Sequence, residues 1–108
     1  MPVTTSLDGA VLTARLSGDI DHFTAADMRS EIDRAVTMNP VSELVLDFSA
    51  VNFMDSSGIG LVMGRSKLMS ELGGKCSVCD PPAYIVKVMK LSGIDKLCPI
   101  LGEGGVRL

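Results

Sequence analysis

The sequence predicts one α/β domain over residues 1–108, with a mixed β-sheet that opens with a β-hairpin and is flanked by helices. Two observations lead to this fold class. Two segments of alternating apolar and polar residues are joined by Asp8 and Gly9, a dipeptide typical of two-residue hairpin turns. Beyond them, segments with helical spacing of apolar residues alternate with short apolar runs, as crossover connections between parallel strands require. A chain of 108 residues, 46% of them hydrophobic, suffices for one core.

The hairpin strands are expected at residues 3–7 and 10–17. On the second strand, every other residue is apolar, so these side chains share the inward face: Ala10, Leu12, Ala14 and Leu16. Residues 19–23 are mostly polar and are expected to form a loop.

The first helix is expected to begin near Thr24, because Thr24 and Asp27 have the spacing of a capping pair. Its apolar residues recur at helical spacing: Ala25, Met28, Ile32, Ala35 and Val36. Asn39 and Pro40 end this helix. Residues 44–48 are apolar almost throughout, which is typical of a central strand that is buried on both faces.

A second helix is expected over about residues 57–72, and a strand follows at residues 75–78. Pro81 and Pro82 open a third helix, since proline is favoured in a first helical turn. Four apolar residues of that helix are expected to face inward: Ile85, Val88, Met89 and Leu91. A short last strand is expected at residues 97–101.

Composition limits the class of partner. The net charge is −3 and there is no basic run, so no nucleic-acid partner is expected. No apolar stretch has the length of a membrane span, and the N-terminus lacks a signal-peptide pattern. We therefore expect a cytoplasmic protein that does not act at a membrane. The glycine-rich residues 102–108 are expected to form a loose tail.

The cysteines do not indicate a metal or redox site. Cys76 and Cys79 form a C-x-x-C pair, but the pair lies in a strand-like run, where residues three apart point to opposite faces. Zinc would also need a fourth ligand beyond Cys76, Cys79 and Cys98, and His22 is the only histidine. We therefore expect no metal and no cofactor.

The second helix carries more apolar residues than a single packing face needs. Seven residues cluster on the side expected to pack: Gly58, Leu61, Val62, Arg65, Leu68, Met69 and Leu72. Arg65 must therefore extend to solvent or find a carboxylate. The opposite side carries Ile59 and Met63 with Gly60 and Gly64, a smooth apolar strip that indicates a docking surface.

Two serines stand at the expected start of this helix, in the run Phe53-Met-Asp-Ser-Ser-Gly-Ile-Gly60. Backbone N–H groups at a helix N-terminus are unpaired, and the helix dipole favours negative charge there. A serine in this position can carry a phosphate, hold the phosphate of a ligand, or cap the helix. Ser56 and Ser57 are the two candidates for these roles.

Two enzyme or cofactor hypotheses start from the same run. Gly58, Gly60 and Gly64 after a strand, with Asp80 about twenty residues on, partly match a dinucleotide fingerprint. However, residues 50–57 intervene between strand and helix, and the last two of those glycines lie inside the helix.

A serine hydrolase is the second hypothesis. His22 beside Asp21 and Asp55 could activate Ser56 as a nucleophile. The G-x-S-x-G elbow is absent, and nothing in the sequence fixes His22 near Ser56. We therefore expect that the protein is not an enzyme.

The runs Leu16-Ser-Gly-Asp-Ile-Asp-His-Phe-Thr-Ala25 and Phe53-Met-Asp-Ser-Ser-Gly-Ile-Gly60 resemble a STAS-domain anti-sigma factor antagonist, in particular its stage II sporulation members. Arg65, residues 73–74 and residues 90–94 continue the pattern. Two departures stand out. Phe23 replaces a polar residue common in the family, and the usual last helix has no counterpart in the glycine-rich tail.

The resemblance implies partner switching. Such a domain binds an anti-sigma factor that is itself a serine kinase, releases the sigma factor, and is turned off when the kinase phosphorylates it; a phosphoserine phosphatase resets it. By position, Ser56 is the phosphorylated residue. Its neighbour Ser57 is expected to cap the helix, because it stands at the helix start. The implied partner-binding residues are Asp21, His22, Thr24, Asp55, Ser56, Ser57, Gly58, Ile59, Gly60 and Met63.

Other functions stay open on the sequence alone. A STAS domain of another system, such as a stressosome scaffold or a transporter regulator, would share the motifs. A small nucleotide-binding protein or hydrolase is the alternative from a different class.

Overall fold

The fold was obtained as a computed structural model that describes residues 2–108. Within these residues a five-stranded sheet has the order β1-β2-β3-β4-β5, with β1 antiparallel to β2 and every other pair parallel. The mixed sheet with an opening hairpin confirms the predicted fold class. The elements are β1 (Val3–Asp8), β2 (Val11–Ile20), α1 (His22–Met38), β3 (Glu43–Met54), α2 (Ser56–Glu71), β4 (Lys75–Cys79), α3 (Ala83–Ser92), β5 (Ile100–Leu101), and two 3-10 turns, η1 (Ile94–Lys96) and η2 (Glu103–Gly105).

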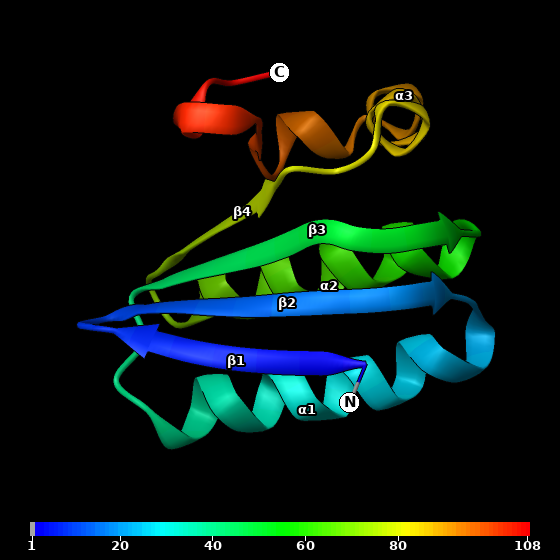
Figure 1. The fold of residues 1–108 in the computed structure, drawn as a ribbon. Helices are drawn as coiled ribbons and strands as arrows, with labels where there is room; N and C mark the ends of the chain where they lie inside the picture. The colour runs from blue at the N-terminus through cyan, green and yellow to red at the C-terminus, as the bar shows by residue number, and fades with distance from the viewer. Residues whose placement is uncertain (1) are drawn as a thin grey trace.

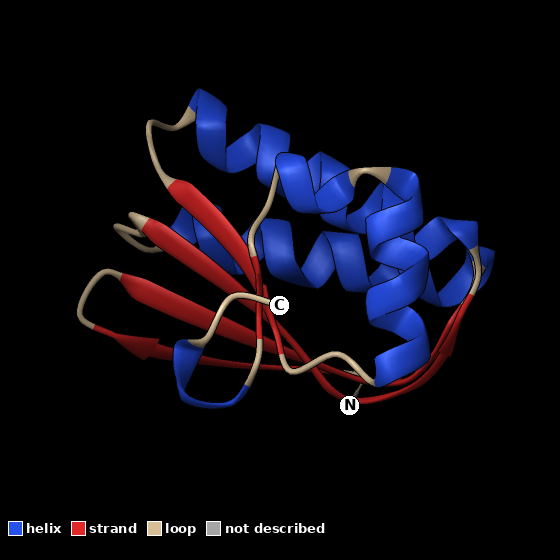
Figure 2. Ribbon diagram, turned by 90° about the horizontal axis from the view of Figure 1, so that it is seen from above, coloured by secondary structure: helices blue, strands red, loops and turns tan. Residues whose placement is uncertain are grey.

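Helices α1 and α2 pack against one face of the sheet and contact each other (Figures 1 and 2). The core lies between them and the strands, and α1 contributes Met28, Ile32 and Val36 to it. From the sheet, Leu12, Ala14 and Leu16 are at most 2% exposed, which confirms the predicted inward face of β2. Burial of each large aliphatic side chain stabilises the fold by about 1.5–3 kcal/mol.

The hairpin turn lies one residue later than predicted. Asp8 pairs with Val11, so the two turn residues are Gly9 and Ala10 rather than Asp8 and Gly9. Gly9 has a φ of 61°, a left-handed conformation that glycine adopts without strain. Ala10 is therefore part of the turn and does not belong to the inward face of β2.

Strands β2 and β3 are longer than predicted. Residues 19–23 and 50–57 were expected to be loops, but β2 continues to Ile20 and β3 continues to Met54. The two extensions pair with each other, Asp19 with Phe53 and Ile20 with Met54, after two shifts of register. Mutual hydrogen bonding and burial of Ile20 and Met54 therefore override the polar composition of these segments.

The first helix begins two residues earlier than predicted. Asp21 is its N-cap, and the capping box joins Asp21 to Thr24, not Thr24 to Asp27. The sequence contains both spacings, and the end of β2 at Ile20 selects the earlier one.

The third helix packs through a narrower face than predicted. Ile85 and Met89 are fully buried, but Val88 is 37% exposed and Leu91 is 80% exposed, so the inward assignment of these two residues was wrong. Figure 1 shows α3 beyond the end of β4, away from the layer formed by α1 and α2. Ile85 and Met89 therefore form the one stripe through which α3 joins the core.

The C-terminal region differs from its prediction in detail. The last strand comprises Ile100–Leu101 alone, because the N–H groups of Leu97 and Cys98 donate to the Ile94 carbonyl of the turn η1 and Pro99 has no N–H. In residues 102–108, expected to form a loose tail, the Gly102 N–H donates to the Val106 carbonyl at 2.6 Å, and the Leu108 N–H donates to the Ile100 carbonyl at 2.8 Å.

Candidate functional site

Two helix N-termini lie next to each other at one edge of the sheet. Strands β2 and β3 run in parallel and end at paired residues, Ile20 and Met54. Each strand passes into a helix through a single aspartate, Asp21 or Asp55. The Asp55 N–H donates to the Ile20 carbonyl at 3.1 Å and joins the two helix starts (Figure 1). Two helix dipoles therefore direct their positive ends to the same side of the molecule.

Ser56 is the first residue of α2 and is exposed. Asp55 is the N-cap, and its carboxylate accepts from the Ser57 N–H at 2.8 Å. The prediction that Ser57 caps the helix was therefore wrong, because the residue before both serines already fills that role. Within residues 2–108 the Ser56 hydroxyl has no hydrogen-bond partner, so it is free to react.

The start of α1 is held by a complete capping box. The Asp21 carboxylate accepts from the backbone N–H groups of Phe23 and Thr24, both at 2.9 Å, and the Thr24 hydroxyl accepts from the Asp21 N–H at 2.9 Å. The hydrogen bond from the Thr24 N–H is the main reason why the pKa of Asp21 lies below its ordinary value of 3.8. The ring of the exposed Phe23 meets that of His22 edge-on at 5.5 Å.

The predicted apolar strip on α2 is only partly exposed. Met63 is 47% exposed and Gly60 is exposed, but Ile59 is half-buried and packs against the core. Gly58 is buried, and a Cβ at this position would lie 2.5 Å from the Met54 sulfur. Gly58 therefore serves the packing of α2 on the end of β3 and does not add to the exposed surface.

A groove of about 400 Å³ lies between α1 and α2. It brings together three of the predicted partner-binding residues, His22, Ser57 and Gly60. It also contains Arg29 and Ala26, which sequence reasoning missed. Their only signal was a position one turn beyond His22 and Ala25 on α1. Met63 lies outside this groove, in a second hollow with Leu97.

Arg65 joins the two helices at the bottom of the groove. Its Nε lies 2.8 Å from Asp33 Oδ1 on α1, which confirms that Arg65 finds a carboxylate. The two atoms are close enough for an ion pair but are not aligned as a hydrogen bond, and both are buried without one. Burial is the main cause that lowers the pKa of Arg65, and the Asp33 charge opposes it.

The comparisons with known proteins decide the family. The profile of the STAS domain matches residues 2–102. The chain belongs to the STAS domain family. This result confirms the resemblance identified from the two motifs.

Several relatives of this STAS domain are named as regulatory proteins. An anti-sigma F factor antagonist of Paenibacillus polymyxa is 39% identical over 90 residues, which cover 83% of this chain and 77% of the relative. The structure of the anti-sigma factor antagonist SpoIIAA in its unphosphorylated form has a TM-score of 0.79 at 27% identity, over 94% of this chain and 89% of that chain. The Bacillus cell fate determinant SpoIIAA in the phosphorylated form has a TM-score of 0.72 at 27% identity, over 94% and 92%.

The structure of the STAS domain also bears on the dinucleotide hypothesis. One argument against it was wrong, since a single residue, Asp55, rather than a long loop separates β3 from α2. The other argument is confirmed, since Gly60 and Gly64 lie inside α2, where their N–H groups belong to the helix. They cannot form a phosphate-binding turn.

The geometry does not assemble a hydrolase site either. His22 and Ser57 line the same groove, but within residues 2–108 His22 makes no hydrogen bond with Ser56.

None of the helices in the described residues is long and apolar enough to span a membrane.

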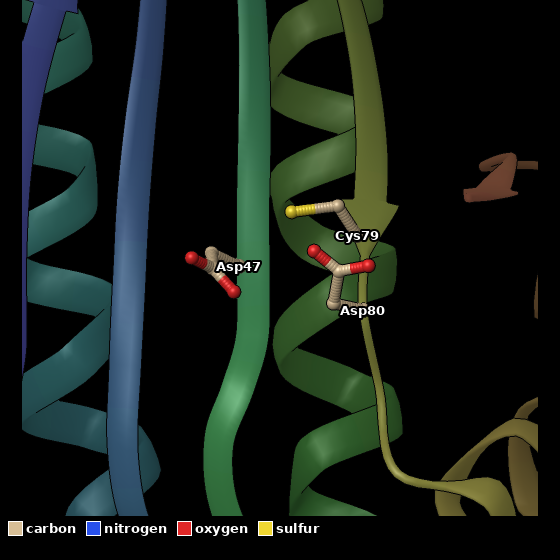
Figure 3. Close-up of side chains that lie close together, drawn as sticks. All are labelled: Asp47, Cys79 and Asp80. Atoms are coloured by element: carbon tan, nitrogen blue, oxygen red, sulfur yellow. The ribbon is translucent and has the colours of Figure 1, made fainter. Parts of the chain in front are cut away.

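A separate cluster lies on the sheet face opposite α2. Asp47 on β3, Cys79 at the end of β4 and the following Asp80 each have one ligand atom within 4.8 Å of the others (Figure 3). Burial and the two carboxylates raise the pKa of the Cys79 thiol to about 11, so it stays protonated at neutral pH. Cys76 is buried on the other face, as the strand spacing predicted.

Proposed function

We propose that this protein is an anti-sigma factor antagonist, a regulatory binding protein rather than an enzyme. In this proposal it binds a cognate anti-sigma serine kinase, releases the sigma factor, and is switched off when the kinase phosphorylates Ser56. The observation that carries the proposal is the exposed Ser56 hydroxyl, which follows the capping residue Asp55 at the start of α2 and has no hydrogen-bond partner within residues 2–108. The family and the names of the relatives support it.

The position of Ser56 suits phosphoryl transfer. A protein kinase needs a hydroxyl that can approach the γ-phosphate in line with the leaving group, and a side chain in the first helical turn projects from the surface. No hydrogen bond has to break before phosphoryl transfer, because the Ser56 hydroxyl makes none within the described residues. The related SpoIIAA structures are described in unphosphorylated and phosphorylated forms.

A phosphate on Ser56 changes the surface more than the fold. It adds a charge of about −1.5 to −2 beside the Asp55 carboxylate, which already takes the Ser57 N–H. The N-terminal dipole of α2 tolerates this charge, so the helix should remain folded. A partner surface that packs closely on Ser56 would meet both the bulk and the charge, and binding is lost without a large conformational change.

The proposed binding surface surrounds the two helix starts. The kinase contacts the exposed part of the predicted set, namely His22, Asp55, Ser56, Gly60 and Met63, together with the half-buried Asp21. Thr24 and Ser57 support this surface, because Thr24 holds the cap of α1 and Ser57 lines the groove. A phosphoserine phosphatase restores the active form. The process takes place in the cytoplasm, and regulation of sporulation is the role proposed for it.

Phosphorylation by the cognate kinase tests the proposal directly. The chain is incubated with the anti-sigma kinase of the same organism and ATP, and the intact mass is measured. We expect one added phosphate in the wild-type protein and in Ser57→Ala, and none in Ser56→Ala. Phosphate on Ser56→Ala, or no phosphate on any form, contradicts the proposal.

A further inference from the structure

The groove between α1 and α2 is a local positive site on an acidic protein. The chain has a net charge of −3, yet Arg29 and Arg65 both line this groove and no acidic residue within the range 2–108 does. Arg29 is exposed and, in the part of the chain that the structure describes, forms no ion pair. The proximity of Arg29 also contributes to the lowered pKa of Arg65. Among the described residues, Asp33 pairs with Arg65 alone, and the charge of Arg29 is left without a carboxylate partner.

Arg65 has unused hydrogen-bonding capacity. Only 6% of the residue is exposed, and its guanidinium donates no hydrogen bond among residues 2–108, despite the short ion pair with Asp33. A guanidinium has five N–H donors, and a buried one that leaves them unpaired is unfavourable. Since Arg65 lines the groove, an anion placed there can satisfy these donors.

The fold does not require the two glycines that form the floor of the groove. Gly60 and Gly64 occupy one side of α2, one turn apart, and a Cβ at either position would meet no atom within 4 Å. Neither residue has a positive φ, so alanine would fit and would favour the helix. Gly58 differs, because a Cβ there would meet Met54. The missing side chains at Gly60 and Gly64 leave space for an approaching chain.

We propose that this groove receives an acidic segment of the anti-sigma kinase, with a carboxylate between Arg29 and Arg65 and its backbone close to Gly60 and Gly64. The inference rests on the proposed function and names the chemistry of its partner. Charge complementarity favours this occupant, because Arg29 and Arg65 line the groove and the capping carboxylates of Asp21 and Asp55 do not. Its volume of about 400 Å³ fits a few side chains rather than a domain.

The proposal also gives a physical reason for the switch. Ser57 lines the groove, and Ser56 is its neighbour at the start of α2. A phosphate on Ser56 therefore places negative charge beside the entrance of a groove that receives a negative segment. Like charges at an interface oppose association, and Arg29 can turn toward the phosphate instead of the kinase.

Charge reversal tests the groove. We expect Arg29→Glu to weaken kinase binding by at least about tenfold, as measured by isothermal titration calorimetry, and Arg29→Lys to retain most of the affinity. Arg34→Glu is the matched control, since Arg34 is exposed on α1 but does not line the groove. The affinity of this variant for the kinase should stay within about twofold of that of the wild type. Far-UV circular dichroism verifies that the three variants are folded.

Filling the groove is a second, independent test. The double variant Gly60→Ala/Gly64→Ala should raise Tm, because alanine favours helix, and should weaken kinase binding by about tenfold or more. A variant that is more stable and binds more weakly cannot be explained by unfolding.

The outcomes separate this inference from the proposed function. If wild-type protein is phosphorylated on Ser56 but Arg29→Glu and the double alanine variant bind the kinase normally, the groove assignment is wrong and the proposed function stands. If wild-type protein does not bind the kinase, both are wrong. A homodimer in sedimentation that the double variant dissociates would assign the groove to a second copy and overturn the proposal.

Discussion

Asp21 and Asp55 cap two helices that start side by side, because the residues before them, Ile20 and Met54, are paired across parallel strands. The Asp55 N–H bonds the Ile20 carbonyl, so the position of one cap fixes the position of the other. Ser56 follows Asp55 directly and is thereby presented beside the start of α1. The sheet itself thus sets the geometry of the surface on which the switch operates.

The capping carboxylate of Asp21 makes stability depend on pH. Its folded-state pKa lies below the ordinary value of 3.8, since the carboxylate accepts backbone hydrogen bonds that protonation weakens. Its contribution is therefore present above the unfolded-state pKa and is lost as the pH falls through the folded-state value. Wild type should lose stability between about pH 5 and pH 2, and we expect this loss to be smaller in Asp21→Asn. The free energy of unfolding in urea measures both. Parallel pH profiles of wild type and variant would contradict this account.

The ion pair between the buried Arg65 and the half-buried Asp33 should stabilise the contact between α1 and α2. Asp33→Asn leaves Arg65, 6% exposed, without a compensating charge, and we expect the free energy of unfolding to fall by about 2 kcal/mol. Asp27→Asn, an exposed position on the same helix, serves as the control and should change it by less than about 0.5 kcal/mol. Urea denaturation at pH 7 measures both, and equal stability of the two variants would show that the pair is dispensable.

The glycines of α2 should differ in their response to alanine. At Gly58 the new methyl group would lie 2.5 Å from the Met54 sulfur, and we expect a loss of about 1 kcal/mol in unfolding free energy. At Gly60 the same change meets no atom and should stabilise the protein by up to about 1 kcal/mol. Thermal unfolding of the two single variants measures the contrast. Destabilisation of both would mean that Gly60 has an internal role.

Met63 tests the exposed end of the predicted strip. The side chain is 47% exposed on α2, so Met63→Glu should leave Tm within a few degrees of wild type. A charge at the centre of an apolar contact should weaken kinase binding by about tenfold or more. Leu91→Glu, at an 80% exposed position on α3, is the control and should bind normally. Normal binding of Met63→Glu would remove Met63 from the interface.

The parts of the fold that follow local rules could be predicted from the sequence. The alternation Leu12, Ala14, Leu16 identified the inward face of β2, and the helical spacing on α2 placed Arg65 on the packing face, where a carboxylate was needed. These patterns follow from which side chains of a single strand or helix are buried. The sequence of that element is therefore enough to predict its inward face.

The extension of the strands to Ile20 and Met54 could not be predicted in this way. The segments contain Asp19 and Asn52, which locally favour a turn, and only the pairing of β2 with β3 makes them strands. The early cap at Asp21 depends on that extension. Arg29 was missed for a related reason, since its place in the groove depends on how α1 packs beside α2.

The central claim is that a phosphate on Ser56 ends kinase binding without unfolding the domain. The direct measurement is the affinity of the kinase for the unphosphorylated protein and for the protein phosphorylated on Ser56, with the Tm of both forms. We expect binding to weaken by at least about tenfold while Tm changes by only a few degrees. Equal affinity for the two forms, or a phosphorylated form that is unfolded, would contradict the account.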